Sequence, residues 1–136
     1  MEAGKKFRVF GEPVEVLVAG EATGGLSTTL IQISPPGGGP PPHSHTNEDE
    51  TFFVLEGEYE FLADKEWRKA EVGRAIHSGR GAVHTFRNAG TTEGRMLVFV
   101  APAGMERYLE EISVLAMPQD AEQLMAISAR YGIAFV

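Results

Sequence analysis

Short runs of alternating hydrophobic and polar residues fill most of this chain, and glycine, proline, asparagine and aspartate separate them. Alternation with a period of two predicts strands that bury one face. These runs are also rich in β-branched and aromatic residues, which favour strands. Because turn signals recur about every 8–12 residues, the pattern favours a sandwich or barrel. The expected strands are 14–18, 28–33, 51–55, 58–62, 67–69, 74–77, 83–88 and 95–100.

Two connections stand out in this pattern. Asp64-Lys65 separates two expected strands and predicts a tight hairpin turn. The segment 34–42 is rich in proline and glycine and leads directly into His43. Its composition is that of a linker, but the chain is too short for two domains. We therefore expect a stiff loop over the mouth of a barrel.

The hydrophobic period changes to that of a helix near the C-terminus. The first predicted helix has hydrophobic positions at Met105, Tyr108, Leu109 and Ile112. For the second helix, Asp120 and Gln123 predict a capping box, and Gly132 predicts the end. The residues expected to face the barrel or a partner subunit are Leu124, Met125, Ser128 and Tyr131.

Composition narrows the class of protein. With 136 residues, the chain is expected to form a single domain, residues 1–136. The net charge of −7 disfavours nucleic-acid and anionic-membrane partners. No apolar run is long enough for a membrane span or a signal peptide, so a cytoplasmic location is expected. Since the chain has no cysteine, thiolate metal sites and disulfides are excluded.

Three of the four histidines lie in two segments bracketed by glycine. The first has the spacing Gly37-x5-His43-x-His45-x4-Glu50-x6-Gly57. The second has the spacing Gly73-x5-Gly79-x-Gly81-x2-His84-x3-Asn88. Two residues apart on a strand, the first two imidazoles would lie on the same face. The carboxylate would open the next strand, and the third imidazole would approach from another strand.

This pattern predicts a site for one divalent transition metal, held by His43, His45, Glu50 and His84. Imidazole nitrogen and carboxylate oxygen without sulfur suit Fe, Mn, Ni, Co, Cu or Zn, and spacing does not choose among them. Taken singly, each piece has another interpretation. The His-x-His pair resembles a surface feature, residues 48–50 resemble a solvated acidic turn, and His84 resembles a hydrogen-bonded core residue. Their compatible strand positions favour the metal site.

The two segments resemble the two signature motifs of the cupin superfamily. The motif G-x5-H-x-H-x3,4-E-x6-G is matched in full, and G-x5-P-x-G-x2-H-x3-N is matched except that Gly79 replaces the proline. The resemblance covers about residues 26–104 and points to small bacterial quercetin-dioxygenase-like cupins. Residues 102–109 are also similar to the helix that follows the barrel in those relatives. The difference at Gly79 affects a turn and no ligand.

The resemblance implies an all-β fold, a cupin jelly-roll β-barrel with short C-terminal helices. The barrel core would span about 26–104, and the helical segment about 105–132. The family's metal ligands correspond to His43, His45, Glu50 and His84. In this family Glu50 would both hold the metal and accept a proton, as a catalytic residue. Small cupins commonly form dimers, so a homodimer is expected, with contacts through 7–18 and the C-terminal helices.

Three functions agree with this sequence. The first is a metal-dependent dioxygenase acting on a small aromatic or enolic substrate. The second is a metal-dependent sugar or hydroxy-carbonyl isomerase. The third is a non-catalytic module that binds or senses a small molecule. The partner in each is a small molecule. Five alternating hydrophobic residues would either line its cavity or form ordinary core, and core is the favoured interpretation for each: Phe52, Val54, Tyr59, Phe61 and Phe86.

Two further polar residues have weaker interpretations. Asn88 would lie on the same strand face as His84 and hydrogen-bond within the site, or it would form a turn with the glycine that follows. The second interpretation is favoured. His77 has no partner at ligand spacing and is expected to be structural or on the surface.

Overall fold

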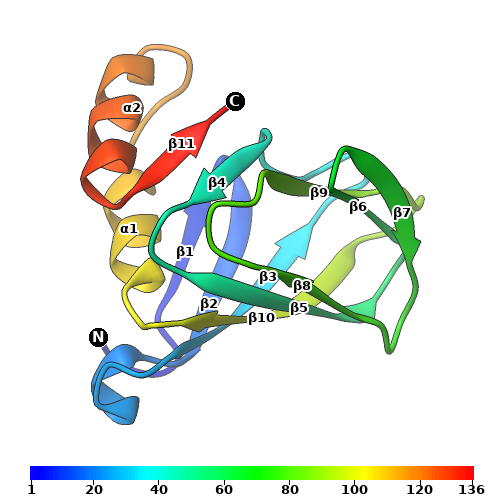
Figure 1. Cartoon of the computed structure of the whole chain (residues 1–136), viewed down its shortest axis with the longest axis horizontal. Helices are drawn as coiled ribbons and strands as arrows, with labels where there is room; N and C mark the ends of the chain where they lie inside the picture. Colours follow the sequence, from blue (N-terminus) through cyan, green and yellow to red (C-terminus); the bar gives the residue numbers. More distant parts are fainter.

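Two antiparallel sheets pack face to face, and two helices cover one end of the sandwich (Figure 1). The structure is a computed structural model that describes all 136 residues. In spatial order, the six-stranded sheet consists of β1 (Lys6–Val9), β2 (Glu12–Val18), β3 (Thr28–Ser34), β10 (Gly94–Ala101), β5 (Asp49–Glu56) and β8 (Ala75–Ser78). The five-stranded sheet consists of β11 (Ile133–Phe135), β4 (His43–His45), β9 (His84–Asn88), β6 (Tyr59–Ala63) and β7 (Glu66–Ala70).

The core lies between the sheets, as the alternation of residues predicts. On β10, Met96, Val98 and Val100 are buried, while Phe99 between them is exposed. Phe52 from one sheet meets Phe61 and Phe86 from the other, with ring centroids 5.2 and 5.8 Å away. All eight strands expected from the sequence are present, with small differences at their ends. The prediction of an all-β fold with two C-terminal helices is confirmed.

The predicted hairpin joins β6 to β7. Asp64 and Lys65 have φ values of 52° and 67°. Left-handed backbone at both central positions is what a two-residue turn between twisted strands requires. The register places Ala63 opposite Glu66, which confirms the hairpin prediction.

Three strands lie outside the eight expected ranges: β4, which the spacing of His43 and His45 had implied, and the two edge strands β1 and β11. β1 pairs with β2, and β11 pairs with β4 at the sheet edge. Both are short, so their alternation covers too few residues to stand out from a loop. The strand β11 matters for the site because it returns the C-terminus to the strand that carries two of the histidines (Figure 1).

The helices α1 (Met105–Ile112) and α2 (Ala121–Arg130) confirm the predicted positions, but the predicted capping box is wrong. Asp120 occupies the N-cap position without capping its helix. Its Oδ2 accepts a hydrogen bond from the backbone N–H of Ala116 instead. Gly132, with φ 72°, ends the second helix as predicted. Leu124 and Ser128 are buried, whereas Met125 is 52% exposed.

The first helix is tied to the sheet by Glu106, which is 1% exposed. Its Oε1 accepts hydrogen bonds from the Thr28 hydroxyl at 2.7 Å and from the Gly104 N–H at 2.8 Å. Its Oε2 accepts one from the Gly20 N–H at 2.7 Å. One carboxylate thus joins η1 (Gly20–Thr23), β3 and the start of α1.

The proline- and glycine-rich loop before the first histidine lies along β9. The Gly37 N–H donates to the Asn88 carbonyl at 2.8 Å, and the Asn88 N–H donates to the Gly38 carbonyl at 2.9 Å. A Cβ at Gly39 would lie 2.0 Å from the Phe86 carbonyl oxygen, so only glycine fits there. These contacts hold the loop in one path, as expected of a stiff segment. Neither helix has the length and apolar character needed to cross a membrane.

Candidate metal centre

Two neighbouring strands position the three histidines. His43 and His45 lie two residues apart on β4, so both imidazoles lie on the face toward the opposite sheet. On β9, His84 pairs directly with His43 across the ladder. The ring centroids of this pair are 4.5 Å apart, and those of His45 and His84 are 5.4 Å apart. The strand register therefore brings the three imidazoles together.

Glu50 reaches the same point from the opposite sheet, near the start of β5. Its Oε1 lies 2.7 Å from His45 Nε2 and 3.3 Å from His84 Nε2. Each of the four residues offers one ligand atom, and all four atoms lie within 4.8 Å of one another. The structure brings together all four residues predicted from the motif. Three side chains come from one sheet and one from the other, so the cluster joins the two layers.

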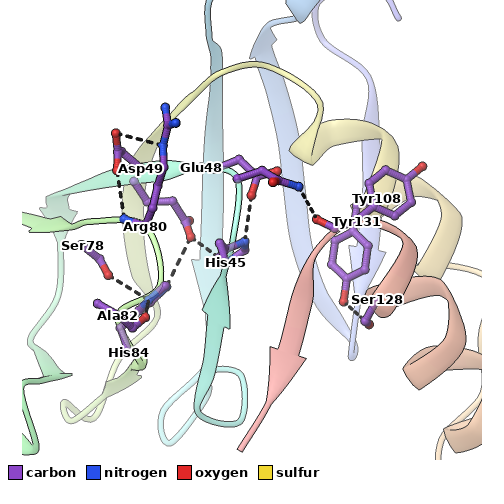
Figure 2. A network of polar contacts seen from close by, with 12 residues as sticks. His45, Glu48, Asp49, Ser78, Arg80, Ala82, His84, Tyr108, Ser128 and Tyr131 are labelled. Atoms are coloured by element: carbon purple, nitrogen blue, oxygen red, sulfur yellow. Dashed lines mark hydrogen bonds and ion pairs between the residues drawn. The ribbon is translucent and has the colours of Figure 1, made fainter.

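Hydrogen bonds to the other ring nitrogens orient two of the imidazoles. His43 Nδ1 lies 2.8 Å from the Pro41 carbonyl oxygen, which only accepts, so this nitrogen carries the proton. His84 Nδ1 lies 2.9 Å from the Ser78 hydroxyl and 3.3 Å from the Ala82 carbonyl, as Figure 2 shows. In both rings Nε2 is then left with a free lone pair, which is the arrangement seen in metal-binding histidines.

Glu48 was missed as a candidate, although its spacing of three from His45 was available in the sequence. Its Oε2 lies 3.6 Å from His45 Nδ1 (Figure 2), whereas Glu50 Oε1 approaches the other ring nitrogen, Nε2. Glu48 is 8% exposed, and Glu50 is also buried. The alternative interpretation of residues 48–50 as a solvated acidic turn is therefore wrong for both. Only Asp49 points outward, where it accepts a hydrogen bond from the Arg80 N–H at 2.9 Å.

Burial and close contacts within the cluster shift the pKa values of its side chains. Burial and the nearby His84 lower the pKa of His43 to about 4, which keeps this imidazole neutral. Burial opposes the charged form of His45, but the carboxylates of Glu48 and Glu50 outweigh it and raise the pKa of His45 to about 9. Burial also opposes charge on Glu50, yet His45 and His84 hold the pKa of its carboxyl well below the usual range. The carboxylate is thus anionic at neutral pH.

The four residues fit a divalent metal. Buried atoms without a hydrogen-bond partner gather here, among them His45 Nε2, His84 Nε2 and Glu50 Oε1. Such atoms are costly to bury unless something binds them. Ligands on opposite sides of one ion lie about 4 Å apart, so small side-chain rotations suffice to surround it. Three nitrogens and one oxygen suit the first-row transition metals, without selecting one.

A cavity of about 80 Å³ opens onto this cluster between the sheets. Of its 19 lining residues, 13 are hydrophobic, and none is lysine or arginine. All five hydrophobic residues singled out from the sequence belong to the core, as favoured, and two of them, Phe52 and Phe86, also line the cavity. The helix α1 and the edge strand β11 close one side. The space corresponds to roughly six water molecules, so a small ligand fits.

The remaining polar predictions have structural outcomes. Asn88 is buried, and its amide donates to the carbonyls of Ser34 and Thr92 while its oxygen accepts from the Gly90 N–H. It therefore supports a turn, as favoured from the sequence. His77 is exposed and lies 3.1 Å from the Thr51 hydroxyl, away from the cluster. At Gly79, which replaces the proline of the motif, the turn is held by the Ala82 N–H donating to the Gly79 carbonyl at 3.2 Å.

Comparison with known families gives one clear match. Residues 30–100, more than half of the chain, match the family described as Cupin domain. The matched segment runs from β3 to β10 and contains all four residues of the cluster. No match to this sequence was found among curated proteins.

Solved structures with the same fold differ in their stated activities. KdgF from Halomonas sp. is 15% identical with a TM-score of 0.67, and the match covers 76% of this chain and 90% of that one. A predicted oxalate decarboxylase from Thermotoga maritima is 23% identical with a TM-score of 0.64, covering 72% and 90%. A sugar phosphate isomerase from Silicibacter pomeroyi is 23% identical with a TM-score of 0.56, covering 65% and 59%. At these identities the likeness establishes the fold alone.

Proposed function

This chain belongs to the cupin domain family, and we propose that it is a metal-dependent enzyme of the dioxygenase type that acts on a small, uncharged aromatic or enolic substrate. The observation that carries the proposal is the position of the ligand cluster. His43, His45 and Glu50 form one wall of a cavity whose other walls are mostly hydrophobic. A substrate in this cavity would present its oxygen atoms to the metal and its carbon framework to Phe52 and Phe86.

The absence of cationic side chains from the cavity wall favours this class of substrate. No lysine or arginine lines the cavity, and Glu12 and Glu50 add negative charge. A phosphate or dicarboxylate would lose its hydration there without gaining a cationic partner, which costs free energy. Sugar phosphates and oxalate, the substrate types named for two structural neighbours, are therefore poorly matched to this site.

A bound divalent metal would supply a Lewis acid with open positions for a substrate oxygen and for dioxygen. The protein would contribute binding and a base. Imidazole Nε2 atoms would hold the ion, and Glu50 would accept the proton of the substrate hydroxyl when its O–H bond breaks. Dioxygen is then the four-electron oxidant of the carbon framework, and both its oxygen atoms end in the products. No separate reductant is needed for this balance.

The same carboxylate supports the second candidate, a hydroxy-carbonyl isomerase. Glu50 is a buried carboxylate in the cavity wall, where it would take a proton from carbon next to a carbonyl and return it. That reaction consumes no dioxygen. The two candidates therefore differ in one measurable quantity, the uptake of oxygen.

The test begins with metal analysis of the untagged protein, followed by reconstitution with Fe(II), Mn(II), Co(II) and Ni(II). Small enols, catechols and hydroxy-ketones are then offered under air and under nitrogen. Oxygen uptake with both atoms of ¹⁸O₂ in the product supports the dioxygenase. Turnover that is equal under nitrogen supports the isomerase, and binding without turnover supports a binding module. Two variants test the site itself, because His84→Ala should lose metal while His77→Ala should keep it.

A further inference from the structure

A second polar site lies in the cavity at a distance from the metal cluster. Apart from the cluster, the polar side chains of the wall are Glu12, Gln32 and Tyr108. The Tyr108 hydroxyl is paired with the Ser128 hydroxyl at 2.8 Å, so it is already used within the fold. Glu12 and Gln32 therefore supply the polar groups of a wall that is otherwise hydrophobic.

Glu12 has an unused oxygen. Its side chain belongs to the buried face of β2, in phase with Val14 and Val16, and it is 8% exposed. Oε2 accepts a hydrogen bond from the Gly39 N–H at 3.0 Å. Oε1 is fully buried and has no hydrogen-bond partner. A buried carboxyl group with one unpaired oxygen in an apolar wall costs free energy unless a ligand completes its hydrogen bonds.

A second polar group without a partner lies beside this carboxyl group. The Ser34 hydroxyl beside it is also buried without a hydrogen-bond partner. A Cβ at Gly38 would lie 2.8 Å from Pro35 Cδ and 3.1 Å from Glu12 Oε1, so glycine lets the loop approach this carboxyl group closely. Burial raises the pKa of the Glu12 carboxyl, against the hydrogen bond from the Gly39 N–H and the influence of the Ser34 hydroxyl beside it. The group is therefore less able to stay charged than an exposed glutamate.

The strand register separates this site from the metal cluster. Gln32 of β3 lies opposite Met96 of β10, and Glu50 of β5 lies opposite Val100 of the same strand. Four residues of a strand extend over roughly 13 Å. Val14 also pairs with Gln32, and Glu12 lies one inward-facing position beyond it, farther from the cluster. A ligand that touches both sites must be elongated.

We propose that Glu12 and Gln32 form a second anchoring point, and that the ligand is an elongated, uncharged molecule with chelating oxygens at one end and a hydroxyl group at the other. This inference rests on the proposed function. A hydroxyl group both donates and accepts, so it satisfies a carboxyl and an amide together. An anionic group would find no cationic side chain there, and an ammonium group would lose its hydration among hydrophobic side chains. In this role Glu12 and Gln32 are positioning residues.

The experiment compares two probes that differ in one hydroxyl group, 3,4-dihydroxybiphenyl and 3,4,4′-trihydroxybiphenyl. Binding to the Co(II)-reconstituted protein is measured by calorimetry, and the visible spectrum of the Co(II) reports contact with the metal. The wild-type protein should bind the trihydroxy probe about tenfold more tightly, the value of one good hydrogen bond. Gln32→Met and Glu12→Met should bind the two probes about equally. Glu12→Gln should keep most of the preference, because an amide also hydrogen-bonds a hydroxyl group.

Two controls separate anchoring from folding. Glu15→Met changes a position three residues along β2, on the opposite face of the strand near Lys6, and should leave the preference unchanged. Gln32→Met leaves the contact between Glu12 and Gly39 intact, so it tests the site even if Glu12→Met fails to fold. Equal binding of both probes by the wild-type protein would overturn the second anchor, and so would a preference that survives Gln32→Met. If neither probe changes the Co(II) spectrum, the proposed function fails together with this inference.

Discussion

His45 lies between two carboxylates, with Glu50 Oε1 2.7 Å from its Nε2 and Glu48 Oε2 3.6 Å from its Nδ1. Glu50 faces the common centre of the cluster, and Glu48 faces away from it. A carboxylate behind a metal-binding imidazole orients the ring and makes its other nitrogen more basic. The spacing from His45 to Glu48 is three residues, so both functions come from one short turn of chain.

Glu48→Gln should weaken metal binding without removing it. The amide keeps the size of the side chain but loses the negative charge that supports His45. Loss of such a partner typically costs 10–100-fold in metal affinity. Competition with a chromophoric chelator measures the change. Asp49→Asn is the matched control, because Asp49 points outward to Arg80, and its metal affinity should equal that of the wild-type protein.

Glu50→Gln should lose most turnover while it keeps some metal. Three histidines hold many divalent metals by themselves, and the amide oxygen still reaches the ion. The amide cannot accept a proton, so activity should fall by about 10²–10⁴-fold if proton transfer limits the rate. Rates must be compared at equal metal occupancy. Full activity in metal-loaded Glu50→Gln would exclude the role as a base and leave the histidine site standing.

Removal of the metal should lower the stability of the protein as well as its activity. Without an ion, the cluster gathers buried nitrogen and oxygen atoms that have no partner. An ion that binds only the folded state stabilises it by about 2.7 kcal/mol at a hundredfold excess over its dissociation constant. Calorimetric scans before and after chelation measure the shift in Tm. A Tm that chelation leaves unchanged, in protein proven to contain metal, would contradict the site.

Glu106→Gln should destabilise the fold by about 1–3 kcal/mol, because three donors converge on one carboxylate. An amide nitrogen would face one of these donors in place of an oxygen. Urea unfolding at pH 7 measures the difference in the free energy of unfolding. Glu110→Gln is the control, since Glu110 makes only a half-exposed ion pair with Lys5 and should change stability by less than about 1 kcal/mol.

The difference in the free energy of unfolding between the wild-type protein and Glu106→Gln should depend on pH. Burial would raise the pKa of Glu106, but hydrogen bonds from Thr28 and the backbone of Gly20 outweigh burial and lower it. A carboxyl group whose pKa is lower in the folded state stabilises that state above its unfolded pKa and loses this effect as the pH falls. The gap between wild type and Glu106→Gln should therefore be largest above about pH 5 and shrink in more acid solution. A gap that widens in acid would contradict this assignment.

Association of two chains remains a prediction. Exposed hydrophobic side chains occur on both segments expected to make contacts, at Phe10 and Val18 near the N-terminus and at Met125 on α2. We expect sedimentation at micromolar concentration to report a dimer. Phe10→Lys and Met125→Lys should shift it toward the monomer, whereas Glu58→Lys, on the turn at the start of β6, should not. A species of 14.7 kDa alone would exclude the homodimer.

The local features of this protein were decided by the sequence. Alternation along β10 and β5 reports which side of a strand is buried, because side chains point to opposite faces in turn. Asp64-Lys65 indicates a hairpin because it separates two alternating runs by two residues, and Asp64 readily adopts left-handed backbone. The spacing of His43 and His45 places both rings on one face for the same reason. These features depend on neighbours along the chain, and the sequence contains those neighbours directly.

Only the tertiary structure decided how distant residues meet. The motifs predict that Glu50 and His84 meet, but only the packing of the two sheets shows that they approach from opposite layers, on β5 and β9. Asp120 has the sequence of a cap, yet its carboxylate bonds Ala116 because the preceding loop folds back onto it. Glu12 has the same residue type as the exposed glutamates, and its place in the cavity wall follows from the register of β2 on β3. Pairing between strands that are distant in sequence sets the burial of these carboxylates, and burial sets their hydrogen bonds and pKa values.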